Sequence, residues 1–184
     1  MSVQLVMSNS SVRDTTLSCN SLDIRYEVSH SRSGSITTVQ KWDRSINKHT
    51  TVGEFRLPFF FRDTIRVQNE TEWHPLKGFL FKEGRRIFNT SRVFEGAGGI
   101  KYKWRIQRSA LQLCRASDTA GDQGGPLVVY HRPRQKEDAP FLEIIDPSVL
   151  YSLDLVVVTF LIMERKRRIR NRQRRGALIA VAAS

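Results

Sequence analysis

Basic side chains near the end of the chain are the largest group of residues whose type and spacing indicate chemistry. Residues 165–175 (RKRRIRNRQRR) contain eight arginines or lysines and no acid. Guanidinium and ammonium groups bind anions through charge-assisted hydrogen bonds, so this segment predicts an anionic partner. No aromatic residue interleaves the arginines, and stacking on nucleic-acid bases is therefore not indicated. The predicted anion-binding residues here are Arg165, Lys166, Arg167, Arg168, Arg170, Arg172, Arg174 and Arg175.

A second basic group lies in the middle of the chain. In residues 100–107 (IKYKWRIQ) apolar and polar side chains alternate strictly, which is the pattern of a half-buried strand. Three basic side chains therefore share one face, and with two nearby arginines they are a candidate phosphate-binding patch. The alternative is a strand face that is charged only because it contacts water. The members of this patch are Lys101, Lys103, Arg105, Arg85 and Arg86.

Catalytic and metal-binding patterns are weak. Residues 121–127 (GDQGGPL) resemble the nucleophile loop of trypsin-like serine proteases, but Gln123 stands at the nucleophile position and a carboxamide cannot attack a carbonyl. The four histidines are scattered, and two cysteines are too few for a cysteine-based zinc module. We therefore expect a non-enzymatic protein with no catalytic residue, no cofactor and no metal.

Asp154 is an acid inside the apolar segment 149–163. Asp146 and Pro147 form a good helix start, so this segment is expected to be a helix at about 147–164, with a central strand as the alternative. Fifteen helical residues rise about 22 Å, too little to cross a membrane core of about 30 Å. The helix is therefore expected to be buried in the protein. A buried Asp154 needs hydrogen-bond donors, so it either fixes the helix register or forms a ligand or proton site.

Charge is distributed unevenly along the 184 residues. The chain has 30 basic and 18 acidic side chains, a net charge of +12, of which +8 comes from residues 165–175 and +4 from residues 1–164. The N-terminus has no basic and apolar pattern of a secretory signal, and no paired-cysteine framework is present. We therefore expect an intracellular, cytoplasmic protein, with the nucleus or a membrane surface as further locations suggested by its charge.

Short strands dominate the rest of the chain. Their near-regular spacing predicts a mainly β protein, an antiparallel barrel of about 12 strands that encloses the apolar C-terminal helix. We divide the chain into a barrel domain at 1–164 and a basic extension and tail at 165–184. Strands are expected at 3–7, 23–30, 35–42, 51–57, 60–68, 79–81, 86–88, 92–94, 100–107, 111–115, 127–131 and 141–145.

Several short segments resemble, in their order and spacing over roughly residues 10–168, a fungal single-domain family of unknown function that is placed with the tubby C-terminal-like superfamily. These segments are EWH (72–74), RVF (92–94), YKW (102–104), LEI (142–144), LDLVVVTF (153–160) and ERKRR (164–168). The superfamily, which also includes LURP-one-related proteins and phospholipid scramblases, implies a β-barrel around a central hydrophobic helix. Tubby proteins bind phosphoinositide headgroups, but no lipid-binding residue of theirs can be matched to a position here.

These observations favour an intracellular binding protein that recognises anionic phospholipid headgroups, of the phosphoinositide kind, through its basic surface and the arginine-rich segment. One alternative is a nucleic-acid-binding or nuclear-targeted protein that uses the same segment. A second alternative is a small-ligand-binding barrel or an unrecognised enzyme.

Overall fold

The computed structural model describes residues 2–31, 33, 35–58, 61–68, 70–82, 90–107, 110–116, 124–133, 135 and 138–182, with the side chains of 175 and 177–182 excepted. These residues form one antiparallel sheet of 12 strands around a long C-terminal helix. The strands are β1 (Val3–Met7), β2 (Thr15–Cys19), β3 (Ile24–His30), β4 (Ile36–Asp43), β5 (Lys48–Arg56), β6 (Thr64–Val67), β7 (His74–Pro75), β8 (Arg92–Glu95), β9 (Lys101–Gln107), β10 (Ala110–Arg115), β11 (Val128–His131) and β12 (Phe141–Ile144). The helices are α1 (Leu76–Phe79) and α2 (Leu153–Ala182).

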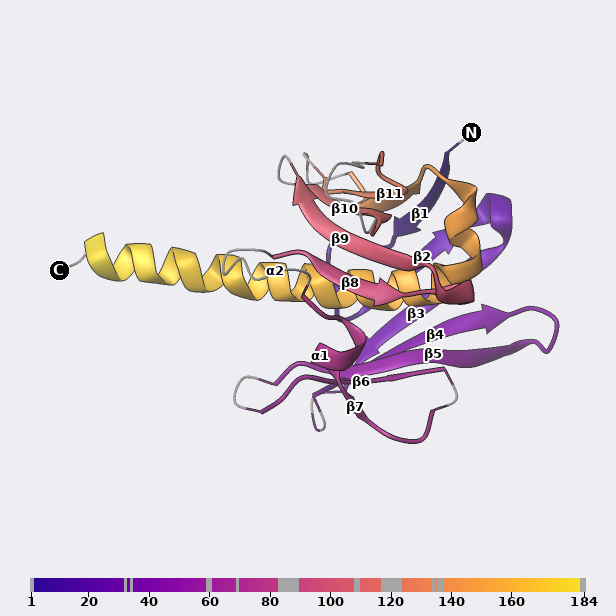
Figure 1. Cartoon of the computed structure of the whole chain (residues 1–184), viewed down its shortest axis with the longest axis horizontal. Coiled ribbons are helices and arrows are strands. Elements are labelled where there is room, and N and C mark those ends of the chain that lie inside the picture. The colour runs from indigo at the N-terminus through magenta and orange to yellow at the C-terminus, as the bar shows by residue number, and fades with distance from the viewer. Residues whose placement is uncertain are drawn as a thin grey trace.

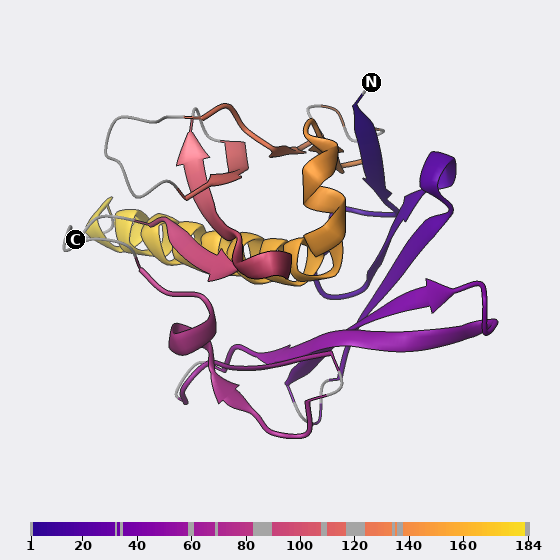
Figure 2. The same cartoon turned by 45° about the vertical axis from the view of Figure 1, so that its right-hand side comes forward.

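The sheet wraps around α2, with strands on opposite sides of the helix in both views (Figures 1 and 2). Its strand order is β7-β6-β5-β4-β3-β2-β1-β12-β11-β10-β9-β8, so β1 joins the two halves by pairing with β12. Val3 lies opposite Ile144, and Leu5 lies opposite Leu142. The first and last strands of the sequence are therefore neighbours in the middle of the sheet.

The predicted alternation is seen in β9. Tyr102 and Trp104 are fully buried, whereas the side chains of Lys101, Lys103 and Arg105 belong to the opposite face. The indole N–H of Trp104 donates a hydrogen bond of 2.9 Å to the hydroxyl of Thr159 on α2. A buried polar ring atom is thus satisfied by the helix, which ties β9 to α2.

The central helix is longer than predicted. Asp146 accepts a hydrogen bond from the Ser148 N–H, as expected for a cap, but the first residues, Pro147–Ser152, form a 3₁₀ turn and α2 begins at Leu153. At the other end α2 continues to Ala182 rather than ending near 164. Arginine is a good helix former, so the change from apolar to basic residues alters what surrounds the helix without ending it.

The mainly antiparallel sheet around an apolar C-terminal helix is confirmed, but the hydrogen-bonded ladder is not closed. In the described part of the chain β7 and β8 are the edge strands, and they do not pair with each other. β7 is only two residues long because Pro75 lacks an N–H and α1 follows directly. After α1, Phe81 forms an isolated bridge to Val93 of β8, with N···O distances of 3.0 and 2.8 Å.

The remaining strand predictions were not all met: one is wrong, one is untested, and one observed strand was missed. The strand predicted at 79–81 is wrong, because Leu76–Phe79 form α1 and only Phe81 pairs. The strand predicted at 86–88 lies outside the described residues. β2 was not predicted, although its alternating burial is regular.

Within the described residues, one helix, Pro147–Arg174, is long and apolar enough by length and composition to span a membrane, and 67% of its most apolar window is buried inside the protein. Val156 to Glu164 are all buried in the sheet. The apolar segment therefore supplies the core of the fold, as its all-round hydrophobicity predicts.

The contact between α2 and β5 leaves no space for a methyl group at Gly53. A Cβ placed on Gly53 would lie 2.8 Å from Cγ2 of Val158. We expect Gly53→Ala to lower the free energy of unfolding by about 1–3 kcal/mol, the usual cost of overpacking. Urea denaturation measures this, with Gly78→Ala as the control because a Cβ at Gly78 meets nothing within 4 Å. Equal effects of both substitutions would contradict the packing.

Candidate anion-binding site at the exit of the central helix

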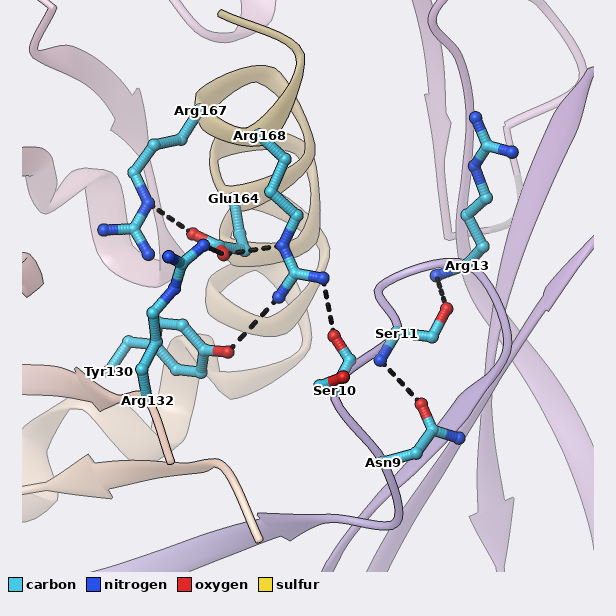
Figure 3. Close-up of polar contacts among 9 residues, drawn as sticks. All are labelled: Asn9, Ser10, Ser11, Arg13, Tyr130, Arg132, Glu164, Arg167 and Arg168. Carbon is cyan, nitrogen blue, oxygen red and sulfur yellow. Dashed lines mark hydrogen bonds and ion pairs between the residues drawn. The ribbon is translucent and has the colours of Figure 1, made fainter. Parts of the chain in front are cut away.

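A buried carboxylate organises the place where α2 leaves the sheet. The side chain of Glu164 is fully buried and forms ion pairs with three arginines (Figure 3). Oε1 accepts from Arg132 and Arg168, each at 2.7 Å, and Oε2 accepts from Arg167 at 2.6 Å. Three cations around one anion leave this cluster with a net charge of +2.

The hydrogen bonds of Glu164 dominate its titration. Burial alone raises the pKa of Glu164, but the hydrogen bonds from Arg167, Arg132 and Arg168 outweigh it, so the pKa lies below its usual value. The carboxylate is therefore charged at neutral pH. The side chains of Arg167 and Arg168 are consequently partners of a structural acid, although the sequence predicted them as residues that bind an external anion.

Arg168 also connects the helix to the loop between β1 and β2. Its Nη1 donates to the carbonyl of Ser10 at 2.6 Å (Figure 3). Within this loop, Asn9 accepts from the Ser11 N–H at 2.7 Å, and the Ser11 hydroxyl accepts from the Arg13 N–H at 3.1 Å. These side chain to backbone bonds hold the loop in a tight turn and fix the position of Arg13.

A cavity of about 980 Å³ opens beside this cluster. Its walls come from α2, the loop before β2, β8, and the segments after β5 and before β6. Seven charged residues line its described part, five basic and two acidic, which gives a net charge of +3 with His30 neutral. They are Arg13, Arg92, Arg165, Lys166, Arg170, Asp14 and Asp63.

The two acids of the cavity already have partners. The carboxylate of Asp63 pairs with Lys166, and Asp14 accepts the backbone N–H of His30 at 3.0 Å. Across the described residues, no carboxylate lies within ion-pair distance of Arg13, Arg92, Arg165 or Arg170. The described lining of the cavity therefore has more guanidinium groups than carboxylates to pair with them.

The pKa values in the cavity reflect this excess. Burial lowers the pKa of Arg165 and Arg13 lowers it further, and together they outweigh Asp63, which raises it. Burial followed by Arg170 lowers the pKa of Arg92. Burial, then Arg165 and Arg13, also lowers the pKa of His30. A bound anion would relieve the repulsion among these cations, because an opposite charge favours the charged form of each.

The structure divides the predicted anion-binding residues into separate groups. Arg165, Lys166 and Arg170 line the cavity, Arg167 and Arg168 bind Glu164, and Arg172 and Arg174 are exposed further along α2. Arg175 belongs to α2 without a described side chain. Lys101, Lys103 and Arg105 lie on β9 and are not among the cavity's described lining residues, while Arg85 and Arg86 lie outside the described residues.

Sequence reasoning missed Arg13, Arg92 and Glu164. Arg13 and Arg92 reach the cavity from elements distant in sequence, so no local spacing indicated them. Glu164 did have a signal, because acidic and basic residues three and four positions apart share a helix face.

Asp154 has hydrogen-bond donors from two strands, which fits the first of the two roles expected for it, fixing the helix register. Its Oδ1 accepts from the Tyr26 hydroxyl at 2.5 Å and from Lys41 at 3.0 Å. It is about one third exposed rather than fully buried, because it lies where α2 enters the sheet. Burial and the adjacent Asp154 raise the pKa of Tyr26, so the phenol stays protonated and donates.

Metal-binding side chains do not gather in the described part of the molecule. No group of three or more His, Cys, Asp or Glu residues there is placed to hold an ion. Cys19 and Cys114 are both buried thiols. Residues 121–123 of the protease-like loop lie outside the described residues.

Fold and site together define a β protein built on one sheet around an internal helix, with a cationic cavity where the helix emerges. The chain belongs to the Family of unknown function (DUF6593), whose model matches residues 10–169. No curated protein and no solved structure matches it.

Proposed function

We propose that this protein is a non-enzymatic, intracellular binding protein that attaches to anionic phospholipid surfaces, those rich in phosphoinositide-like headgroups above all. The observation that carries this proposal is the outer part of α2. From residue 165 onward the helix contains eight basic residues and no acid, and residues 171–174 are exposed. The C-terminal part of α2 projects from the sheet (Figure 1). Each basic residue near an anionic membrane contributes about 1 kcal/mol.

The residues after the arginines favour a membrane over nucleic acid. Residues 177–182 (ALIAVA) are all apolar and still belong to α2. An apolar end next to basic residues suits the boundary between headgroups and acyl chains, where both chemistries are satisfied. The phosphate backbone of nucleic acid offers the arginines a partner but gives the apolar end none.

The fold is compatible with the relationship that the sequence resemblance implies. We propose that the sheet is a tubby-like barrel in which α1 and the Phe81–Val93 bridge span the gap between β7 and β8. Lipid attachment at the end of the helix would then be a peripheral contact, since the long apolar part of α2 before Glu164 is engaged in the core.

Vesicle flotation tests the proposal. Wild-type protein is expected to float with phosphatidylcholine vesicles that contain phosphatidylinositol phosphates and to stay unbound with phosphatidylcholine alone. The double variant Arg172→Gln/Arg174→Gln should lose about tenfold or more in affinity, because two contacts of about 1 kcal/mol each are removed. Raising the salt concentration should weaken wild-type binding.

The matched control is Arg25→Gln/Arg44→Gln, which removes the same charge from exposed residues of β3 and the β4–β5 turn. It should bind vesicles like the wild type. Equal binding by both double variants would refute a role for the outer helix. Stronger binding to RNA or DNA than to acidic vesicles at the same salt concentration would favour the nucleic-acid alternative instead.

A further inference from the structure

Arg165 is a buried cation with no carboxylate within ion-pair distance in the described structure, although Asp63 of the same cavity attracts it over a longer range. The residue is 6% exposed, and its Nη1 donates to the Thr37 hydroxyl at 2.9 Å. Its Nε is buried and has no hydrogen-bond partner. A guanidinium stays charged in proteins, and burying it without an anion is costly. This position therefore indicates that something negative completes the site.

The surroundings of Arg165 specify the charge of the missing group. Arg13, Arg92 and Arg170 line the same cavity from three different elements, and each lacks a carboxylate partner. Guanidinium groups pair with phosphate oxygens in a bidentate manner, and several around one group favour a doubly charged anion. His30 contributes a neutral ring at pH 7, because burial and the neighbouring arginines lower its pKa.

The remaining walls indicate that the anion is part of a larger molecule. Leu57, Pro58, Met163 and Ile169 give the lining of the cavity apolar surface as well. The volume of about 980 Å³ lies near the upper end of the range for small-molecule sites, about 300–1,000 Å³, and greatly exceeds that needed by one inorganic ion. The chemistry is that of a phosphate group with an organic body.

We propose that the cavity at the exit of α2 binds a phosphomonoester group, with Arg165 at its base and Arg13, Arg92 and Arg170 around it. The phosphomonoester belongs either to a lipid headgroup or to a soluble phosphate ester. The inference rests on the proposed function, because it places a specific phosphate site beside the part of α2 that is proposed to contact the membrane.

Binding of soluble phosphates is the first test. Isothermal titration calorimetry with inorganic phosphate, glycerol 3-phosphate and the diester dimethyl phosphate should give saturable binding of the first two and much weaker binding of the diester. Arg165→Gln and Arg92→Gln should each weaken glycerol 3-phosphate binding by about 10- to 100-fold, the loss of one charged hydrogen-bonding partner. Thermal unfolding without ligand reports whether both variants fold, and we expect that they do because neither residue pairs with a carboxylate among the described residues.

Matched variants and vesicles separate this inference from the proposed function. Arg172→Gln/Arg174→Gln lies outside the cavity and should bind glycerol 3-phosphate like the wild type. Preference for phosphatidic acid vesicles over phosphatidylserine vesicles of equal charge, lost in Arg165→Gln, would assign the lipid source. Saturable binding of glycerol 3-phosphate without that preference would indicate that the ligand is a soluble phosphate ester.

Two results would overturn the inference. One is the absence of saturable binding of inorganic phosphate and glycerol 3-phosphate to the wild type. The other is equal weakening by cavity and outer-helix variants, which indicates diffuse charge. Vesicle binding that survives either result would leave the proposed function standing, and phosphate binding without vesicle binding would refute the proposed function alone.

Discussion

Replacing Glu164 with glutamine is expected to lower the free energy of unfolding by about 3–5 kcal/mol, the cost of removing one partner from a buried ion pair. The carboxylate is fully buried and neutralises part of the charge of Arg132, Arg167 and Arg168. A glutamine keeps the size but leaves three cations close together without an anion. Urea denaturation followed by circular dichroism measures the loss, because urea does not screen charge as guanidinium chloride does.

Glu27→Gln is the matched control for Glu164→Gln. Glu27 pairs with Arg25 on the surface, where both side chains are more than one third exposed. Exposed pairs of this kind contribute about 0–1 kcal/mol. A loss below 1 kcal/mol for Glu164→Gln, similar to that of the control, would contradict the organising role of the buried carboxylate.

Acid should have a corresponding effect on the wild type. The pKa of Glu164 is lower in the folded protein than its ordinary value, so its contribution is complete above the unfolded pKa of about 4.3 and is lost as pH falls through the folded pKa. The wild type should therefore lose more stability than Glu164→Gln between pH 5 and more acidic conditions. If the stability of the wild type and of Glu164→Gln fell in parallel with pH, the pKa of Glu164 would not be lowered by folding.

Truncation within α2 should give the second large effect, and its size should depend on where the chain is cut. A variant that ends at Glu164 loses Arg167 and Arg168 as well as the buried Arg165. Glu164 would keep only Arg132, and we expect most of the stability of about 5–15 kcal/mol typical of a domain to disappear. A variant that ends at Gln173 keeps all these residues and should differ from the full chain by less than about 1 kcal/mol.

Thermal and urea unfolding of the two truncated variants compare these effects directly. A cooperative transition of normal midpoint in the variant that ends at Glu164 would show that residues 165–170 are a dispensable extension. The structure instead places these residues against the sheet and its loops. Experiments on the basic segment should therefore cut after Gln173 or substitute exposed arginines.

Period-two patterning made much of the sheet predictable from sequence. Tyr102 and Trp104 follow it because one face of β9 contacts α2. The same reasoning failed at Leu76–Phe79, where one short turn of helix is decided by Pro75 and tertiary contacts rather than by periodicity. The end of α2 was misplaced because a change in polarity was read as a change in secondary structure.

The site was only partly predictable for a different reason. The arginine-rich segment identifies the helix that contributes Arg165 and Arg170, but Arg13 and Arg92 join them only through the folding of the sheet. A basic run also does not say which of its members are already neutralised. Glu164 neutralises part of the charge of Arg167 and Arg168. This effect depends on the burial of Glu164, which a sequence alone does not report.

The pairing of β1 with β12 and the position of α2 have a consequence for how the protein acquires its fold. Ribosomes synthesise α2 after every strand, so the growing polypeptide has a nearly complete sheet sequence and nothing to fill its concave face. Contacts between distant parts of a chain also close slowly, because loop-closure entropy opposes them. We infer that the sheet completes its folding only after α2 has been synthesised, because the strands have no other element on which to bury their apolar faces.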